Sequence, residues 1–271
     1  TRELEFTAQF AQSGLEPAAM PLVLRPSFST LPAHLILPVV GFKRQLTMRD
    51  PADRSQHGLP DLQLTLPSSL PLPRATLAAG LAEMESVVSV RIGHHAIAPG
   101  ELIRTWTADG LQHFHYRSQG AMRNMATFFA LPQPPKPFAA GAQTIELHTL
   151  RPVAEQNINV LAARDTLAWL GRQVAPYPTQ TLRLMAVPEL GFSGYAMPQT
   201  VLLSHDLAFR SRPRPEAGFS QAYRRAVHET AHQWFGHMIG HGLIEERGFL
   251  VEPLAKYAEL VMIEQRFGKP A

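Results

Sequence analysis

The sequence lacks cysteine, and it lacks any apolar run long enough to span a membrane as a helix. No disulfide can form among its 271 residues, although extracytoplasmic proteins also exist without disulfides. The longest apolar stretch, residues 31–42, is shorter than the ~20 residues of a membrane-spanning helix and contains Pro32 and Pro38. The 25 basic and 22 acidic side chains nearly balance and form no basic stripe, so nucleic acid is not an expected partner.

Helix signals are scarce at the start of the chain, where proline is abundant. Ten of the 24 prolines lie within the first 73 residues, so residues 1–80 are expected to form loops and short strands. The chain begins at Thr1, without an initiator methionine or a leader. We therefore expect a fragment of a longer protein.

Residues 81–151 have the patterns of a β-rich subdomain. Residues 87–92 are typical of a strand. Residues 102–107 and 111–116 flank the turn sequence Ala108-Asp109-Gly110, which predicts a hairpin.

The end of this subdomain is marked by proline. Residues 131–137 contain four prolines and are expected to be an extended connector. A further strand is predicted over residues 144–150, and a domain boundary is predicted near Pro152.

The remaining segment, residues 152–271, alternates helix and strand patterns. Apolar residues recur at spacings of three and four from Val160 to Val174 and predict an amphipathic helix. Residues 182–187 and 196–204 predict two strands. The second is expected at a sheet edge because Pro198 cannot donate a backbone hydrogen bond.

A second helix is predicted from the N-cap Ser220 toward Gly240, and it contains His228-Glu229-Thr230-Ala231-His232. Residues i and i+4 lie on one helix face, so His228 and His232 can bind one zinc ion at ~2.0–2.1 Å. Glu229 projects beside them, where it can act as a general base toward a metal-bound water. The alternative for this sequence is a solvated helix face without a metal.

A metallopeptidase site requires a third ligand, and Glu252 is the best-placed candidate. It precedes Pro253, which a helix accepts only in its first turn, so Glu252 is expected at a helix start. A glycine-rich turn over residues 240–248 would return this helix to the histidine pair and complete a His₂Glu site with one open position. Glu245 and Glu246 are expected to be solvated loop charges.

These residues resemble a known family. Residues 228–236 resemble the zinc helix of the aminopeptidase N-like gluzincin family of zinc metallopeptidases, and residues 250–257 resemble its third-ligand helix. Between His232 and Glu252 lie 19 residues, where the family usually has 18. This spacing is similar to that of the peptidase-like domain that bacterial ABC-transporter permeases carry, and the resemblance spans about residues 39–269.

The resemblance implies an α+β fold with three regions. Residues 1–80 form a loop-rich β segment and residues 81–151 a β-rich subdomain. Residues 152–271 form a thermolysin-like zincin catalytic domain that is incomplete at its C-terminal end.

The resemblance also implies zinc-dependent peptide hydrolysis. Zn²⁺ held by His228, His232 and Glu252 activates a water, and Glu229 takes its proton and passes it to the leaving amine. The implied partners are a peptide substrate and the membrane-spanning segments of a permease, on the extracytoplasmic face of a bacterial membrane. The alternative is a noncatalytic zinc-binding module of such a permease that senses peptides or serves as a scaffold.

Two features depart from the family pattern. Where the family has a strand with an amine-binding Glu, this chain reads Tyr195-Ala196-Met197-Pro198-Gln199. Ala196 and Met197 are still expected to line the cleft through backbone hydrogen bonds. Glu189 is expected to be a solvated loop carboxylate, and the alternative is that it substitutes for the amine-binding Glu. The family's transition-state-stabilising Tyr has no counterpart here, which favours zinc binding with little hydrolysis.

Other histidines are interpreted as structural. His113 and His115 alternate along a predicted strand and therefore share one face, but no third ligand lies near them in the sequence. His237 and His241 fit positions near a helix end.

Overall fold

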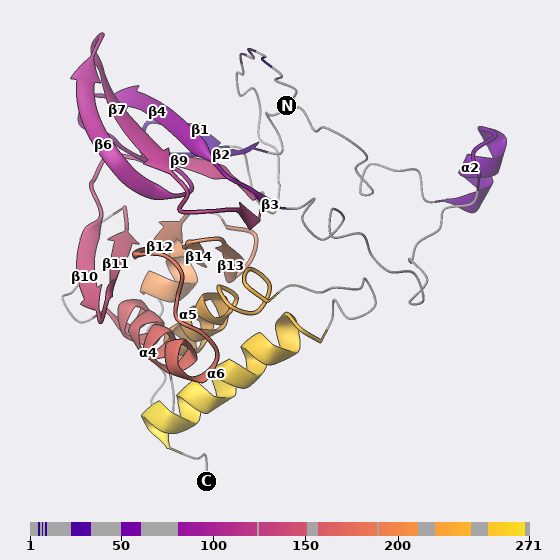
Figure 1. Cartoon of the computed structure of the whole chain (residues 1–271), viewed down its shortest axis with the longest axis vertical. Coiled ribbons are helices and arrows are strands. Elements are labelled where there is room, and N and C mark those ends of the chain that lie inside the picture. Colours follow the sequence, from indigo (N-terminus) through magenta and orange to yellow (C-terminus); the bar gives the residue numbers. More distant parts are fainter. Residues whose placement is uncertain are drawn as a thin grey trace.

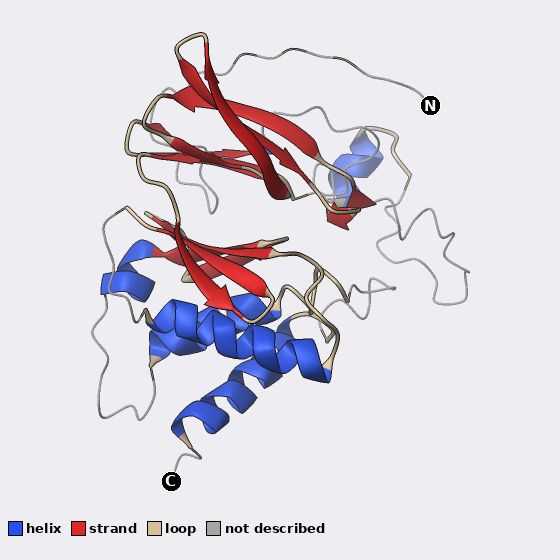
Figure 2. Cartoon of the chain, turned by 60° about the vertical axis from the view of Figure 1, so that its left-hand side comes forward, coloured by secondary structure: helices blue, strands red, loops and turns tan. Residues whose placement is uncertain are grey.

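A computed structural model gives the fold. It describes residues 23–33, 50–60, 81–123, 125–150, 157–188, 190–210, 220–239 and 249–268, together with positions 5, 7 and 9. The described chain is arranged in layers, with two groups of strands above a layer of helices (Figures 1 and 2).

The middle layer is a five-stranded mixed sheet in the order β10-β11-β12-β14-β13. Its strands are β10 (Lys136–Ala140), β11 (Gln143–His148), β12 (Thr181–Val187), β13 (Gly194–Met197) and β14 (Thr200–Ser204). The three central strands are parallel, and the two edge strands run antiparallel to their neighbours.

Three helices cover one face of this sheet (Figure 2). They are α4 (Ile158–Gln173), α5 (Gln221–Ala231) and α6 (Glu252–Phe267), and a short π-helix, η2 (Asp206–Arg210), contacts α5. The side chain of Asn157 caps α4 by accepting the backbone N–H of Asn159 at 3.0 Å. No helix among the described residues has both the length and the apolar character needed to cross a membrane.

The upper layer consists of strands from the first half of the chain. A four-stranded sheet has the order β1-β2-β9-β5, a three-stranded sheet has the order β4-β7-β6, and β3 pairs with β8. Their bounds are β1 (Val23–Arg25), β2 (Phe28–Pro32), β3 (Leu81–Ala82), β4 (Glu85–Arg91), β5 (His95–Ile97), β6 (Glu101–Ala108), β7 (Leu111–Arg117), β8 (Met122–Arg123) and β9 (Thr127–Leu131). A six-residue helix, α2 (Pro51–Gln56), lies apart from the other helices and from the sheets (Figure 1).

Apolar side chains on both faces bury the central sheet. Leu182 and Leu184 of β12 pack into the core between the central sheet and the helices. Met185 and Val187, which point to the opposite face, pack against the four-stranded sheet. β12 is therefore a nearly continuous apolar run, as expected for a parallel strand covered on both sides.

Most of the predicted elements are present. The hairpin over residues 102–116 corresponds to β6 and β7, which pair antiparallel around Asp109 and Gly110. The helix predicted from Val160 corresponds to α4. Helix α6 begins at Glu252, as the position of Pro253 predicts. The prediction of a mixed fold with a β-rich first half is confirmed.

Three local predictions were wrong. Residues 196–204 form two antiparallel strands, β13 and β14, because the chain turns at Pro198 and Gln199. Only β13 is an edge strand, whereas β14 is buried within the sheet. The helix expected to continue toward Gly240 ends at Ala231, and the connector over residues 131–137 contributes the first residues of β10.

Strand pairing joins the three predicted regions. β2 pairs with β9, across residue 80, and β11 pairs with β12, across residue 151. The boundaries at residues 80 and 151 stay predictions, and Pro152 lies outside the described residues.

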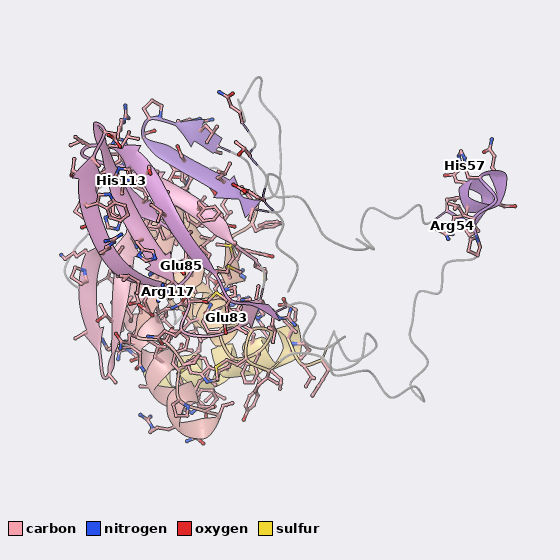
Figure 3. The ribbon with its side chains drawn as sticks, turned by 45° about the horizontal axis from the view of Figure 1, so that its top comes forward. Arg54, His57, Glu83, Glu85, His113 and Arg117 are labelled. Atoms are coloured by element: carbon pink, nitrogen blue, oxygen red, sulfur yellow. The ribbon has the colours of Figure 1, made fainter. Side chains whose placement is uncertain are left out.

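The two histidines that the sequence placed together, His113 and His115, lie on β7 of the three-stranded sheet. Figure 3 shows His113 on this sheet. The ring of His113 stacks on Trp106 and lies 2.8 Å from Ser89 Oγ. His115 lies 2.7 Å from the Glu85 carboxylate, which also accepts a hydrogen bond from Arg117. Both imidazoles therefore take part in side-chain packing of the sheet.

Charged side chains are buried between the central sheet and the upper strands. Arg183 of β12 is 1% exposed, and its Nε lies 3.2 Å from Glu146 Oε2. His148 lies 3.5 Å from the same oxygen, and its ring is 6.0 Å from that of His95. Burial opposes ionisation of Glu146, but contact with His148 and the charge of Arg183 outweigh it and lower the pKa of Glu146 to about 2.

This buried cluster predicts loss of stability in acid. Burial, assisted by the charge of His148, lowers the pKa of His95 from 6.5 to about 4, so the unfolded chain binds a proton that the folded chain does not. Stability should fall as pH decreases from 6.5 toward 4, by up to about 1.4 kcal/mol per pH unit from this residue. We expect His95→Phe to reduce that slope in urea unfolding between pH 7 and 5. An unchanged slope would contradict the assignment.

Candidate metal centre

Helix α5 presents the two histidines of the candidate site. Its first turn is capped by Ser220, whose hydroxyl oxygen accepts the backbone N–H of Tyr223 at 3.3 Å. The helix ends at Ala231, but His232 keeps helical dihedral angles (φ −62°, ψ −16°). His228 and His232 are therefore still one turn apart on the same face.

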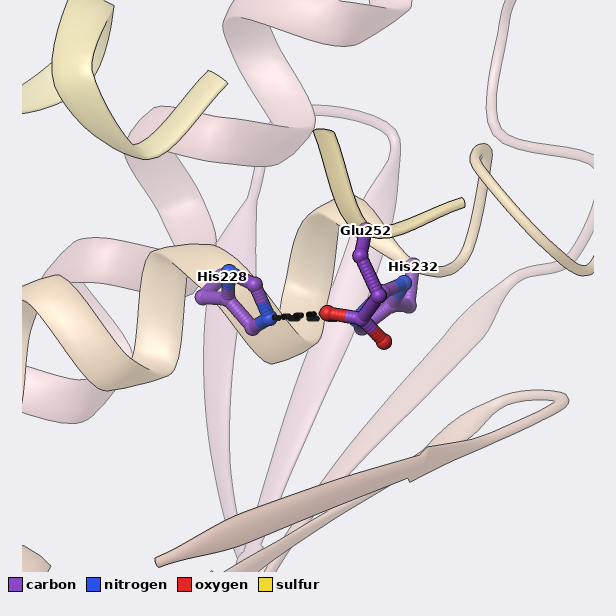
Figure 4. Close-up of side chains that lie close together, drawn as sticks. All are labelled: His228, His232 and Glu252. Carbon is purple, nitrogen blue, oxygen red and sulfur yellow. Dashed lines mark hydrogen bonds and ion pairs between the residues drawn. The ribbon is translucent and has the colours of Figure 1, made fainter. Parts of the chain in front are cut away.

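The three predicted ligands meet at one point (Figure 4). The Nε2 atoms of His228 and His232 are 3.2 Å apart. Glu252, at the start of α6, places Oε2 3.3 Å from His228 Nε2 and Oε1 3.6 Å from His232 Nε2. Among the described residues this is the group of histidine and carboxylate side chains that could hold a metal ion.

These separations fit a tetrahedral zinc ion. Bonds of ~2.0–2.1 Å to a tetrahedral centre place neighbouring ligand atoms about 3.3 Å apart. The observed distances of 3.2, 3.3 and 3.6 Å lie close to that value. The Glu252 side chain is 69% exposed, whereas both imidazoles are largely buried, so the group is open on one side.

The other ring nitrogen of each imidazole faces an oxygen atom. His232 Nδ1 lies 3.0 Å from the carbonyl oxygen of Phe235 and donates to it, which leaves the Nε2 lone pair free for a metal. His228 Nδ1 lies 3.3 Å from Glu259 Oε2, two turns along α6 from Glu252.

Glu259 is a buried carboxylate with several cationic neighbours. It is 2% exposed and accepts hydrogen bonds from Arg224 and Lys256, each at 2.6 Å. Burial acts to raise its pKa, but contact with His228 and Lys256 and the charge of Arg224 lower the pKa to about 2. Glu259 is therefore ionised, and its Oε2 lies within ion-pair distance of His228 Nδ1.

Glu229 lies beside the histidines in a different environment. It is 4% exposed, and the nearest cation is Arg225, at 3.6 Å. Burial raises the pKa of Glu229 to about 7, although the charges of His228 and Arg225 oppose the shift. A carboxylate with this pKa can both accept and return a proton near neutral pH.

The edge strand β13 runs directly past Glu229. A Cβ atom on Gly194 would lie 2.6 Å from both Cγ and Oε1 of Glu229, so only glycine allows this approach. Ser204 N donates to Ser193 O, and hydrogen-bonded pairs alternate along an antiparallel ladder. The N–H and C=O groups of Ala196 therefore point away from β14, on the side where His237 contacts the Ala196 backbone, and Ala196 itself is 8% exposed.

The structure brings together three of the six residues named from the sequence. His228, His232 and Glu252 converge, Glu229 follows His228 in α5, and Ala196 and Met197 lie on the edge strand β13. The roles assigned to these residues remain predictions. Glu189, Glu245, Glu246 and His241 lie outside the described residues, as does the turn expected over residues 240–248.

Two contacts were missed by sequence reasoning. Glu259 follows Glu252 by seven residues, a spacing that returns a side chain to nearly the same face of a helix and could have identified it. Gly194 lies in a loop-like stretch, and nothing in its local sequence indicates the contact with Glu229.

Comparison with known proteins supports the fold. No family model and no curated protein matches the sequence. The chain is similar to a crystal structure of the M1 zinc metallopeptidase from Deinococcus radiodurans, with a TM-score of 0.50 and 18% identity over 69% of this chain and 41% of that chain. The chain is also similar to a mutant of this M1 enzyme bound to a Tyr-Ser-Ala substrate, with a TM-score of 0.50 and 18% identity over 70% of this chain and 42% of that chain.

The chain therefore spans less than half the length of the M1 structures to which it is similar. At 18% identity the likeness shows the fold. The similarity to the M1 structures does not bear on attachment to a transporter. Support for Zn²⁺ as the metal of this site comes from the His₂Glu group and its ligand separations.

The contact between Glu259 and His228 predicts a contribution to metal affinity. Glu259→Gln removes the charge that orients the imidazole, and we expect zinc affinity to fall about 10- to 100-fold. Competition with a chromophoric chelator measures the change. The control is Lys256→Gln, which removes one partner of Glu259 but leaves its contact with His228. Equal affinities of Glu259→Gln and wild type would contradict the role.

Proposed function

We propose that this chain is the zinc-binding part of a metallopeptidase with a thermolysin-like zincin domain. The observation that carries the proposal is the convergence of His228, His232 and Glu252 beside a buried carboxylate, Glu229. Two imidazoles and one carboxylate with an open position are the donor set of hydrolytic rather than purely structural zinc sites.

The proposed function assigns a different role to the metal ligands, to Glu229 and to Ala196. Zinc bound at this site would lower the pKa of a bound water toward ~7 and polarise a peptide carbonyl. Glu229 accepts the proton of the water at a carboxylate oxygen and returns it to the leaving amine. The backbone groups of Ala196 that point away from β14 would hydrogen-bond to an extended peptide in place of their contact with His237.

Specificity for a free N-terminus is not part of the proposal. Pro198 follows the edge strand at the position where the resemblance would require a carboxylate to bind an amine. The same observation favours a second candidate, a noncatalytic zinc-binding module that binds peptides. Attachment to a permease and an extracytoplasmic location are further proposals, supported by the 19-residue spacing between His232 and Glu252.

The proposed function predicts separate effects of two substitutions. His232→Ala should abolish stoichiometric zinc, measured by mass spectrometry of the purified protein. Glu229→Gln should retain zinc but lose peptide hydrolysis by roughly 10²- to 10⁴-fold. N-blocked and unblocked peptides, assayed in parallel, distinguish internal from terminal cleavage.

Zinc without turnover in the wild-type protein would favour the noncatalytic module. Absence of zinc in the wild type, or full turnover by Glu229→Gln, would contradict the proposed peptidase.

The close approach of Gly194 to Glu229 predicts that a substitution at Gly194 reduces turnover without loss of zinc. In Gly194→Ala the new methyl group would displace the flexible end of Glu229, so we expect turnover to fall roughly 10- to 100-fold while zinc is retained. The matched control is Gly171→Ala in α4, where an added Cβ meets no atom within 4 Å. Wild-type turnover in Gly194→Ala would show that the position of Glu229 does not depend on β13.

A further inference from the structure

A buried amide directly follows the second candidate zinc ligand. Gln233 is 2% exposed, and its Nε2 donates to the carbonyl oxygen of Met197 at 2.9 Å. Its Oε1 accepts the backbone N–H of Gln199 at 2.8 Å and the Tyr177 hydroxyl at 3.4 Å. One side chain therefore binds the backbone on both sides of the turn that ends β13.

This pair of contacts requires an amide. Met197 offers an acceptor and Gln199 offers a donor, so the group between them must donate at one end and accept at the other. An ionised carboxylate would face the Met197 carbonyl without a proton to donate. An apolar side chain would leave both backbone groups buried and unsatisfied.

The turn itself is held from the opposite side by Gln199. This residue is 3% exposed and has a φ of 63°, a conformation that non-glycine residues seldom adopt. Its Oε1 accepts the N–H of Gly100 at 3.0 Å, and its Nε2 donates to Glu101 Oε1 at 2.9 Å. Its carbonyl accepts the N–H of Arg183 at 2.8 Å.

The two glutamines thus form one continuous set of hydrogen bonds. It runs from the residue after His232, through the turn after Met197, to the start of β6 and to β12. The turn follows Ala196, whose backbone groups point away from β14. The set therefore ties the end of β13 to the residue that follows His232.

We propose that Gln233 and Gln199 are positioning residues, which hold the edge of β13 in register with the metal ligands so that a peptide on this edge presents its carbonyl to the metal. The proposal rests on the proposed function, because only a peptidase needs this register. Small displacements of a substrate from the reactive geometry reduce turnover strongly.

The test compares three variants. Gln233→Leu removes both side-chain hydrogen bonds, and Gln199→Gly removes the anchor while relieving the positive φ. Gln173→Leu, at the exposed end of α4, is the matched control. Each is assayed for zinc content, for backbone amide hydrogen exchange over residues 194–200, and for kcat and KM on a peptide.

We expect stoichiometric zinc in all three variants. Exchange over residues 194–200 should rise at least tenfold in Gln233→Leu and in Gln199→Gly, and kcat/KM per zinc-loaded molecule should fall at least tenfold. The double variant should lose no more than the more affected single variant, because both act through one set of hydrogen bonds. The control should match the wild type.

Unchanged exchange over residues 194–200 in Gln233→Leu would overturn the proposal. Faster exchange with unchanged kcat/KM would overturn the positioning role. If the wild type binds zinc but cleaves no peptide, the proposed peptidase fails. The exchange experiment, with peptide affinity from calorimetry in place of kcat/KM, still decides whether the glutamines position the edge.

Discussion

Burial of the central sheet on both faces is the constraint on which the candidate site depends. Helices cover one face of β12 and β14, and the four-stranded sheet covers the other. With both faces occupied, the backbone groups that have no partner strand lie at the two edges of the sheet, of which β13 is the one beside α5. Because α5 packs against β13 and β14, its ligand-bearing face is held beside that edge.

Two buried carboxylates on neighbouring helices have opposite electrostatic environments. Glu259 is surrounded by Arg224, Lys256 and His228, and it stays ionised despite its burial. Glu229 faces the charges of His228 and of Arg225, the latter at 3.6 Å, and for it the cost of burial prevails. Carboxylates whose pKa values are driven apart in this way are suited to different tasks. Here one orients an imidazole, and the other is able to exchange a proton.

The parts of the site that follow local rules could be predicted from the sequence. The spacing of His228 and His232 places both on one helix face, and Pro253 fixes the start of the helix that carries Glu252. The hairpin between β13 and β14 could not be predicted, because its turn contains neither glycine nor asparagine. Gln199 adopts its positive φ through contacts with residues distant in sequence, such as Gly100 and Gln233.

The end of α5 was unpredictable for a similar reason. No proline interrupts the sequence after Ala231, and apolar residues continue with helical spacing. The chain nevertheless leaves the helix, with Gly236 at a φ of 120° and a bridge between Phe235 and Ile239. The carbonyl of Phe235 is thereby brought to His232 Nδ1, which a continuing helix would not allow.

The shortness of β13 limits how much of a bound peptide the sheet edge can read. Of its four residues, only Gly194 and Ala196 direct backbone groups outward, and these lie about 7 Å apart. A peptide paired with this edge would be held by its main chain over roughly three residues. Under the proposed function, main-chain pairing of that length would not depend on side-chain identity, so this edge would accept a broad range of sequences in extended conformation.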